Sequence, residues 1–267
     1  MEKNSNQLLG SEISWIIIRD RIEFLKNLER WKIGWEIAFK RILPDSVLRR
    51  YFLETPMGNP TLIVGIHKGK VVASSALIPL SLKNPISSIK INYLQFVAAF
   101  ILPGYSEGFN TYKKMIGLVK DELRHTNCKF ILTFPNADVK NLTIRVGKFK
   151  SLDTGFFIRG KMDPKVINGF KAELEKPFFD KDFLDWRMCA DIFHQEGMIF
   201  KFFNGEKNLL DATSVPLLKN FEGLMPWWES WGDAPFSPID DYRLNMCVYS
   251  LENIPAMKRS FLLSDVF

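Results

Sequence analysis

The chain has 267 residues, of which 46% are hydrophobic and 25% are charged. These proportions are typical of a folded protein with a sizeable core, and they exclude a chain that is disordered over most of its length. Lys and Arg outnumber Asp and Glu by 36 to 30, but no basic run is dense enough to follow a nucleic-acid backbone, so we expect small anionic ligands and no nucleic-acid partner.

The cysteines and the apolar segments predict the compartment. Cys128, Cys189 and Cys247 are far apart and lack the paired spacings of zinc sites or secreted disulfide frameworks, so we expect reduced thiols and no metal. The first residues contain no apolar signal-peptide core, and no run of about twenty apolar residues occurs anywhere. We therefore expect a cytoplasmic protein without a membrane span.

The first elements expected along the chain are a helix and a hairpin. Residues 22–42 have helical periodicity, and Pro44 ends the helix. Its apolar face consists of Trp31, Trp35, Ala38 and Phe39. Two β-branched runs follow, residues 61–66 and 71–78, joined by a turn in which Gly69 supplies a positive φ. This pattern predicts two antiparallel strands.

The next segment, residues 91–134, predicts a strand, a loop, a helix and a second strand. Residues 91–101 are rich in Val, Ile, Phe and Tyr, and Pro103-Gly104 ends this strand. An apolar stripe at helical spacing then begins near Ser106 and consists of Phe109, Tyr112, Ile116, Val119 and Leu123. The free amides and the dipole of such a helix N-terminus would bind a pyrophosphate. The alternative is a plain crossover helix that Ser106 caps.

The remaining elements predict two domains. A short helix at residues 141–146 ends at Gly147, and a strand pair at residues 149–160 completes an α/β domain of residues 1–161. After a polar connector, residues 183–195 are apolar at helical spacing, and Asn204-Gly205 marks a hairpin. Further strands are expected at residues 243–250 and 259–267. Residues 162–267 are therefore predicted to form a second, smaller and mostly antiparallel β domain.

A long loop rich in Pro and Gly is expected at residues 225–243. Loops of this length are usually functional or disordered, and three tryptophans argue against disorder. Its candidate binding residues are Trp227, Trp228, Trp231, Asp240 and Asp241. Indole faces can cover the apolar side of a sugar or nucleobase, and carboxylates can accept hydroxyl protons or hold an amine. The alternative is that the tryptophans form the core of a small domain and the aspartates cap turns.

The order of these elements resembles the GNAT acyltransferases. The resemblance rests on a hairpin ending in Leu77-Ile78-Pro79-Leu80, then Pro103-Gly104-Tyr105, a strand ending in Phe134-Pro135-Asn136, and Gly147 after a short helix. Within the superfamily, the chain most resembles bacterial GNAT-like proteins of sugar-nucleotide and polysaccharide pathways. Further elements of those proteins match Trp186-Arg187 and residues 263–267. The resemblance implies a mixed α/β sheet flanked by helices. It also implies acyl transfer from an acyl-CoA to the amine of a nucleotide-linked amino-deoxysugar.

The resemblance assigns the acyl-CoA co-substrate mainly to backbone amides. Phe100, Ile101 and Leu102 would bind the pantetheine arm and polarise the thioester carbonyl. The pyrophosphate would lie on the backbone of Tyr105, Ser106, Glu107, Gly108 and Phe109. Asn136 would hydrogen-bond the pantetheine amides, although a turn residue after Pro135 is an equal interpretation.

Departures from the family pattern leave the chemistry open. Glu107 stands where the family loop approaches phosphate. Thr143 stands where many members have a tyrosine that acts as general acid to the departing thiolate. Many members have a glutamate on the central strand that acts as general base, whereas this strand offers Tyr93 and Gln95. Both are poor proton-transfer groups near neutral pH. His67, near the sheet end, is a third catalytic candidate. Two other interpretations remain, a non-catalytic GNAT-like module that binds a sugar or protein, and, more remotely, aminoacyl transfer from a charged tRNA.

Overall fold

The computed structural model describes residues 13–55, 57–83, 90–105, 109–161, 192–195, 198–203, 206–212, 222–228 and 238–252. The elements up to residue 161 are β1 (Ser14–Ile18), α1 (Arg21–Phe39), α2 (Asp45–Leu53), β2 (Thr61–His67), β3 (Lys70–Lys83), β4 (Lys90–Ile101), α3 (Asn110–Arg124), β5 (Phe130–Thr133), α4 (Ala137–Arg145) and β6 (Lys150–Lys161). Those that follow are β7 (Ile192–Gln195), β8 (Met198–Phe203), β9 (Glu206–Ala212), β10 (Glu222–Trp228) and β11 (Pro238–Ser250).

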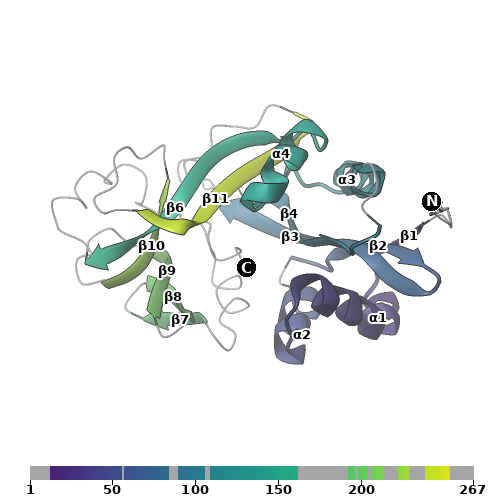
Figure 1. Cartoon of the computed structure of the whole chain (residues 1–267), viewed down its shortest axis with the longest axis horizontal. Coiled ribbons are helices and arrows are strands. Elements are labelled where there is room, and N and C mark those ends of the chain that lie inside the picture. Colours follow the sequence, from purple (N-terminus) through teal and green to yellow (C-terminus); the bar gives the residue numbers. More distant parts are fainter. Residues whose placement is uncertain are drawn as a thin grey trace, which may run out of the picture.

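The strands of the described residues join in one mixed sheet with the order β1-β2-β3-β4-β5-β11-β6-β10-β9-β8-β7. The pairs β4–β5 and β9–β10 are parallel, and the others are antiparallel. Helices α1 and α2 lie on one side of this sheet and α3 and α4 on the other (Figure 1). The predicted mixed sheet flanked by helices is thus confirmed. The domain division after residue 161 stays a prediction, and β11 from the second half lies between β5 and β6.

Helix α1 begins with a side-chain cap and ends in a left-handed residue. The Asp20 carboxylate accepts hydrogen bonds from the amides of Ile22 and Glu23, which satisfies two of the orphan N–H groups of the first turn. Lys40 has a φ of 52° and stops the helix after Phe39. The predicted helix of residues 22–42 was therefore three residues too long at its carboxyl end.

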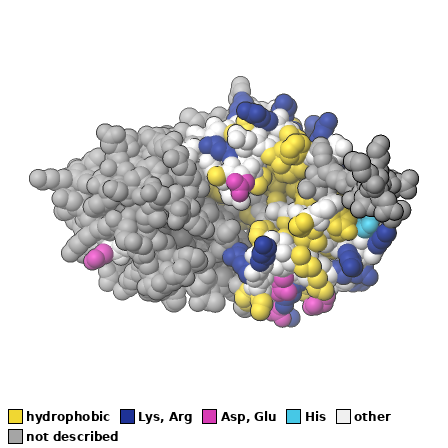
Figure 2. All heavy atoms as spheres, in the orientation of Figure 1, with side chains coloured by type: hydrophobic (Ala, Val, Ile, Leu, Met, Phe, Trp, Pro, Cys, Tyr) yellow, Lys and Arg dark blue, Asp and Glu magenta, His cyan; other side chains and the backbone are white. Residues whose placement is uncertain are grey.

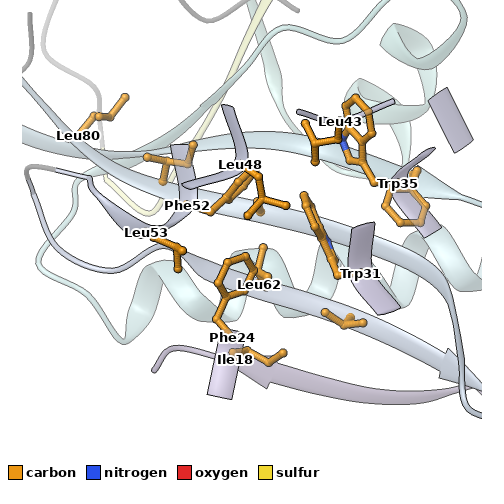
Figure 3. Close-up of a cluster of buried hydrophobic side chains, with 14 of the residues drawn as sticks. Ile18, Phe24, Trp31, Trp35, Leu43, Leu48, Phe52, Leu53, Leu62 and Leu80 are labelled. Carbon is orange, nitrogen blue, oxygen red and sulfur yellow. The ribbon is translucent and has the colours of Figure 1, made fainter. Parts of the chain in front are cut away.

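A hydrophobic core fills the space between the sheet and helices α1 and α2 (Figure 3). Trp31 is fully buried there, and its ring packs edge-on against Phe52 at a centroid distance of 5.0 Å. Its indole Nε1 donates a 2.8 Å hydrogen bond to the hydroxyl of Ser74 on β3. The only polar atom of this side chain therefore has a partner in a largely apolar layer.

A second core lies between the sheet and α3. Its helical side chains include Tyr112, Ile116, Val119 and Leu123, as the apolar stripe predicts. Phe109 does not belong to this stripe, because α3 begins only at Asn110 and the Phe109 side chain is 61% exposed. The helix thus begins later than the periodicity indicates.

Several elements of the first half differ from the predictions. β1 and α2 were not predicted at all. β6 is one continuous strand rather than a pair of strands at residues 149–160. α4 begins at Ala137, four residues before the predicted start, because Asn136 already caps it.

The second half contains more strand than predicted. Residues 192–195, expected in a helical stretch with His194, form β7 and pair with β8. Residues 225–228 and 238–243, expected in a loop, belong to β10 and β11. The predicted hairpin at residues 204–205 is confirmed by the pairing of Phe203 with Glu206. The predictions for residues 183–191, 229–237 and 259–267 lie outside the described residues.

Helix α1 also exposes apolar side chains on its outer face. Ile22 is 65% exposed, and Ile33 and Ile37 are each 56% exposed. Hydrophobic, basic and acidic side chains all reach the surface around α1 and α2 (Figure 2). Among the described helices, α1 included, none is long and apolar enough to cross a membrane.

An ion pair joins the end of β1 to α3. Arg19 Nε donates to Glu122 Oε2 at 2.9 Å, and Arg19 Nη2 donates to Glu122 Oε1. The Glu122 side chain is only 2% exposed, whereas that of Arg19 is 55% exposed. Hydrogen bonding to Glu122 raises the pKa of Arg19 above its usual value. The pair thus neutralises a carboxylate at the edge of the second core.

Replacing Arg19 with Met is expected to lower the free energy of unfolding by about 2 kcal/mol, because it leaves a buried carboxylate without its cation. Water reaches the Arg19 side, so the loss should be smaller than for a fully buried pair. Urea unfolding of the single variant and of the double variant R19M/E122M provides the measurement. We expect the double variant to be the more stable of the two, and the reverse order would contradict this explanation.

Candidate functional site

The parallel strands β4 and β5 pair over only a short length and then part. Their register consists of Leu94 opposite Ile131 and Gln95 opposite Leu132. One residue further on, the Thr133 hydroxyl donates a 3.1 Å hydrogen bond to the Phe96 carbonyl. Beyond this point, among the described strands, β4 pairs with β3 alone. We call the stretch from Phe96 onward the parting of β4 and β5.

A strained bulge lies in β4 at this parting. The register between β3 and β4 shifts between Ser74 and Ala76, so that Ala98 and Ala99 both face Ser75. Ala98 has a φ of 50°, in the left-handed region. This conformation costs an L-residue about 1–2 kcal/mol. Bulges and strained residues gather at functional sites, so this position is a candidate for ligand binding.

The three predicted pantetheine-binding residues follow the bulge. Phe100 pairs with Ser74 and Ile101 with Ala73. The Leu102 amide donates to the Val72 carbonyl at 2.8 Å, so this N–H is already used within the protein. Because backbone groups alternate sides along a strand, the N–H and C=O of Ile101 point away from β3, toward the side of β5.

The predicted pyrophosphate loop is described only at its two ends, because Ser106, Glu107 and Gly108 lie outside the described residues. Tyr105 donates its amide to the Leu102 carbonyl at 3.1 Å and accepts the Thr111 hydroxyl at its own carbonyl. Phe109 has a φ of 61° and provides no side-chain cap for α3. The first turn of α3 has no acidic residue, which favours an anion at this end.

Asn136 caps α4. Its Oδ1 accepts the Val139 amide at 3.0 Å, and its side chain lies on the surface directly after the strand end of β5. The structure therefore contains the turn-type interaction that the sequence offered as an alternative. Contact with a pantetheine amide through the remaining amide group of Asn136 stays a prediction.

The three catalytic candidates lie in two places. Tyr93 is fully buried on β4 and stacks on Phe130 at a centroid distance of 5.3 Å. Tyr93 belongs to the core beneath α1 and α2, and Gln95, two residues further along β4 and 1% exposed, lies on the same face. His67 ends β2 and packs its ring against Tyr105 at 5.2 Å. Tyr93 and Gln95 thus lie below the parting of β4 and β5, whereas His67 lies beside the loop that leads to α3.

A polar contact between α3 and α4 was not foreseen from the sequence. The Tyr112 and Thr143 hydroxyls are 3.1 Å apart, and Thr143 donates its own proton to the Val139 carbonyl. Tyr112 is therefore the donor to Thr143. Burial raises the pKa of Tyr112 above its usual value. The spacing of Tyr112 showed only that it belongs to an apolar stripe, and the spacing of Thr143 showed only that it precedes Gly147.

The thiol of Cys247, which lies near Tyr112, is inert. Cys247 on β11 is fully buried, and burial raises its pKa to about 11. Very little thiolate forms at neutral pH with such a pKa, so Cys247 is not a nucleophile. Among the described residues, no three His, Cys, Asp or Glu side chains gather as metal ligands.

The predicted acceptor residues lie on strands that flank β6. Trp227 pairs with Phe156 and Trp228 with Gly155 across β10 and β6. Asp240 and Asp241 lie in β11, in a stretch where its register with β6 shifts. Trp231 lies outside the described residues. The backbones of Trp227 and Trp228 on β10 and of Asp240 and Asp241 on β11 are thus at the same level of the sheet. They lie on either side of β6, a separation of roughly 10 Å.

Comparisons with known proteins identify the fold. No family model and no curated protein sequence matches the chain. A probable N-acyltransferase of unknown function from Enterococcus faecalis V583 superposes with a TM-score of 0.56 at 9% identity, over 89% of this chain and 73% of its own. A GCN5-related N-acetyltransferase (GNAT) from Kribbella flavida gives 0.54 at 9% identity, over 89% and 72%. This chain has the GNAT fold.

A third solved structure that superposes on this chain is that of a different enzyme. N-myristoyltransferase from Saccharomyces cerevisiae, solved with bound myristoyl-CoA, superposes with a TM-score of 0.53 at 10% identity, over 90% of this chain and 83% of its own. At such identities the similarity is one of fold. It confirms the predicted fold class and carries no information on the acceptor.

Proposed function

We propose that this protein is an N-acyltransferase that uses an acyl-CoA. The observation that supports the proposal is the parting of β4 and β5 behind the bulge at Ala98, directly before the loop that leads to α3, whose N-cap residue Phe109 provides no side-chain cap. Strand amides without a partner strand can hold an extended ligand arm, and a helix N-terminus favours its phosphates. Myristoyl-CoA bound to one protein of the same fold supports this choice of co-substrate.

The proposed reaction needs positioning more than proton transfer. The nitrogen of an unprotonated amine attacks the thioester carbon, the C–N bond forms, the C–S bond breaks, and CoA leaves as a thiol that takes the proton from the amine nitrogen. Holding both reactants at near-attack distance can supply about 7–11 kcal/mol of the barrier. We assign the pantetheine arm to the backbone of Phe100, Ile101 and Leu102, with Ile101 as the residue whose backbone groups point toward β5.

The phosphate end and the reacting end of the ligand are assigned to different residues. We assign the pyrophosphate to residues 105–109, and His67 lies beside Tyr105 at this end. Tyr93 and Gln95 lie at the other end, below the parting of β4 and β5. We therefore assign the reacting amine to the face of Tyr93 and Gln95 and not to His67.

The proposed acceptor is a nucleotide-linked amino-deoxysugar. The supporting features are the tryptophans and aspartates of β10 and β11, and Trp231, which lies between these strands in the sequence. An indole covers the apolar face of a sugar ring, and a carboxylate accepts hydroxyl protons or holds the amine. The residues assigned to it are Trp227, Trp228, Trp231, Asp240 and Asp241.

Isothermal titration of the purified protein with CoA and acetyl-CoA tests the co-substrate. We expect micromolar binding, and we expect Gly108→Asp to weaken it about fivefold to tenfold, because a charge at a helix N-terminus is worth about 1 kcal/mol. Gly117→Asp provides a matched control in the middle of α3, where a Cβ atom meets nothing within 4 Å. This control should retain the affinity of the natural protein within about twofold.

Two outcomes would count against the proposal. Absence of CoA binding up to millimolar concentration would remove the enzyme interpretation and favour a non-catalytic module that binds a sugar or protein. Equal weakening by Gly108→Asp and Gly117→Asp would mean that overall charge, and not the start of α3, governs binding. If CoA binds as expected, screening of amino-sugar nucleotides as acyl acceptors follows.

A further inference from the structure

The side-chain amide of Gln95 is buried without a complete set of partners. Gln95 is 1% exposed, and among the described residues its Nε2 has no hydrogen-bond partner. Nearly all buried polar atoms in proteins are paired, because an unpaired donor costs about 1–3 kcal/mol. Such a donor in the middle of a central strand indicates that its partner is a molecule that binds there.

The position of Gln95 relates it to the proposed acyl-CoA site. Gln95 is the last residue of β4 that pairs with β5, opposite Leu132. Three residues further along β4 is the bulge at Ala98. An arm that runs from the start of α3 along Ile101 toward the bulge would therefore present its acyl end toward Gln95.

The surroundings of Gln95 define the chemistry of its partner. Its cross-strand neighbours are Ile78 and Leu132, and Tyr93 lies on the same face of β4. In such an apolar setting a neutral hydrogen bond is strong, whereas a charged group would be costly. The Gln95 amide cannot take up a proton near neutral pH, and its Nε2 can only donate. The matching atom is therefore an uncharged oxygen.

We propose that Gln95 Nε2 donates a hydrogen bond to an uncharged oxygen of the acyl group of the bound thioester. The proposal rests on the proposed function and names its substrate class, since free CoA lacks the acyl group. Two sources share this chemistry, the thioester carbonyl and a hydroxyl further along the acyl chain. Gln95 and Ala98 are about 10 Å apart along β4. An acyl group that lies between them can therefore place either oxygen, the carbonyl or the hydroxyl, within reach of the Gln95 side chain.

Titrations with CoA, butyryl-CoA and 3-hydroxybutyryl-CoA, on the natural protein and on Gln95→Met, test this proposal. Met has a similar length and volume but no donor. We expect equal CoA affinity in both proteins and a fivefold to tenfold loss of acyl-CoA affinity in Gln95→Met, which is the usual effect of one neutral hydrogen bond. A loss for both acyl-CoAs identifies the carbonyl, and a loss for 3-hydroxybutyryl-CoA alone identifies the hydroxyl.

Three results would overturn the inference. The first is equal affinity of Gln95→Met and the natural protein for every acyl-CoA while CoA itself binds. The second is retained acyl-CoA binding in Gln95→Leu, which has neither a donor nor an acceptor. The third is a clear fall in the unfolding temperature of Gln95→Met, because removal of an unpaired buried donor should leave it equal or higher. Failure of the proposed function is distinct, since then CoA does not bind the natural protein.

Discussion

Replacement of Trp31 with Ala is expected to lower the free energy of unfolding by about 3–5 kcal/mol, which is the usual effect of truncating a buried tryptophan. Trp31 is fully buried at the centre of the core under α1 (Figure 3). Its ring contacts Phe52 at 5.0 Å and Phe24 at 6.2 Å between centroids. The substitution also removes the hydrogen bond to the Ser74 hydroxyl, which then stays buried without this donor.

Urea unfolding of three variants separates the two contributions. Trp31→Ala loses both packing and the hydrogen bond, whereas Trp31→Phe keeps an aromatic ring and loses the indole N–H. Ser74→Ala leaves the indole N–H unpaired, which should cost about 1–3 kcal/mol. A loss below about 1 kcal/mol in Trp31→Ala would contradict the central place of this residue in the core.

Replacement of Gly147 with Ala is expected to lower the free energy of unfolding by about 2–3 kcal/mol, because the new methyl group has no room. A Cβ atom at Gly147 would lie 2.4 Å from the Thr143 carbonyl oxygen and 3.1 Å from the Phe149 ring. The Gly147 amide also donates to the Leu142 carbonyl at 3.1 Å, which holds the chain close to the end of α4. The carbonyl belongs to the backbone, so the clash cannot be relieved by a side-chain rotation.

Gly117→Ala provides the control in the same unfolding experiment. Gly117 lies in the middle of α3, where a Cβ atom meets nothing within 4 Å. Alanine is favoured over glycine in a helix by about 0.8–1 kcal/mol, so this variant should be more stable than the natural protein. Equal effects of the two substitutions would show that helix propensity, and not the close approach to Thr143, governs both positions.

Much of the fold was predictable because its signals are local. The β2–β3 hairpin follows from two β-branched runs around Gly69, and α3 follows from apolar residues at helical spacing. The structure confirms both. The short edge strand β1 and helix α2 were missed, because five and nine residues carry too little periodicity to stand out.

Errors arose where distant segments decide the local structure. Residues 225–228 and 238–243 contain Pro, Trp and Asp, which predict a loop, but β6 provides a strand on which both segments pair. Residues 192–195 have helical spacing and still pair with β8. The tertiary pairing therefore overrides the local preference of these residues.

The candidate site was predictable only in part. The sequence indicated that Tyr93 and Gln95 lie on the central strand, but the positive φ of Ala98 has no sequence signal, because alanine rarely adopts it. Asn136 has the sequence of a turn residue as well as of a ligand contact, and the Val139 amide uses its oxygen for a helix cap. The contact of His67 with Tyr105 joins residues far apart in the sequence.

By itself the sequence determined the fold class, the central strand and the helix that follows it, because hydrophobic periodicity and turn residues act over a few neighbouring positions. Only the tertiary structure decided where β4 parts from β5, that β11 lies between β5 and β6, and that the Gln95 amide is buried without a partner for its Nε2 in the described part of the chain. These features depend on strand pairing between residues distant in sequence, and such pairing is set by the packing of the whole sheet.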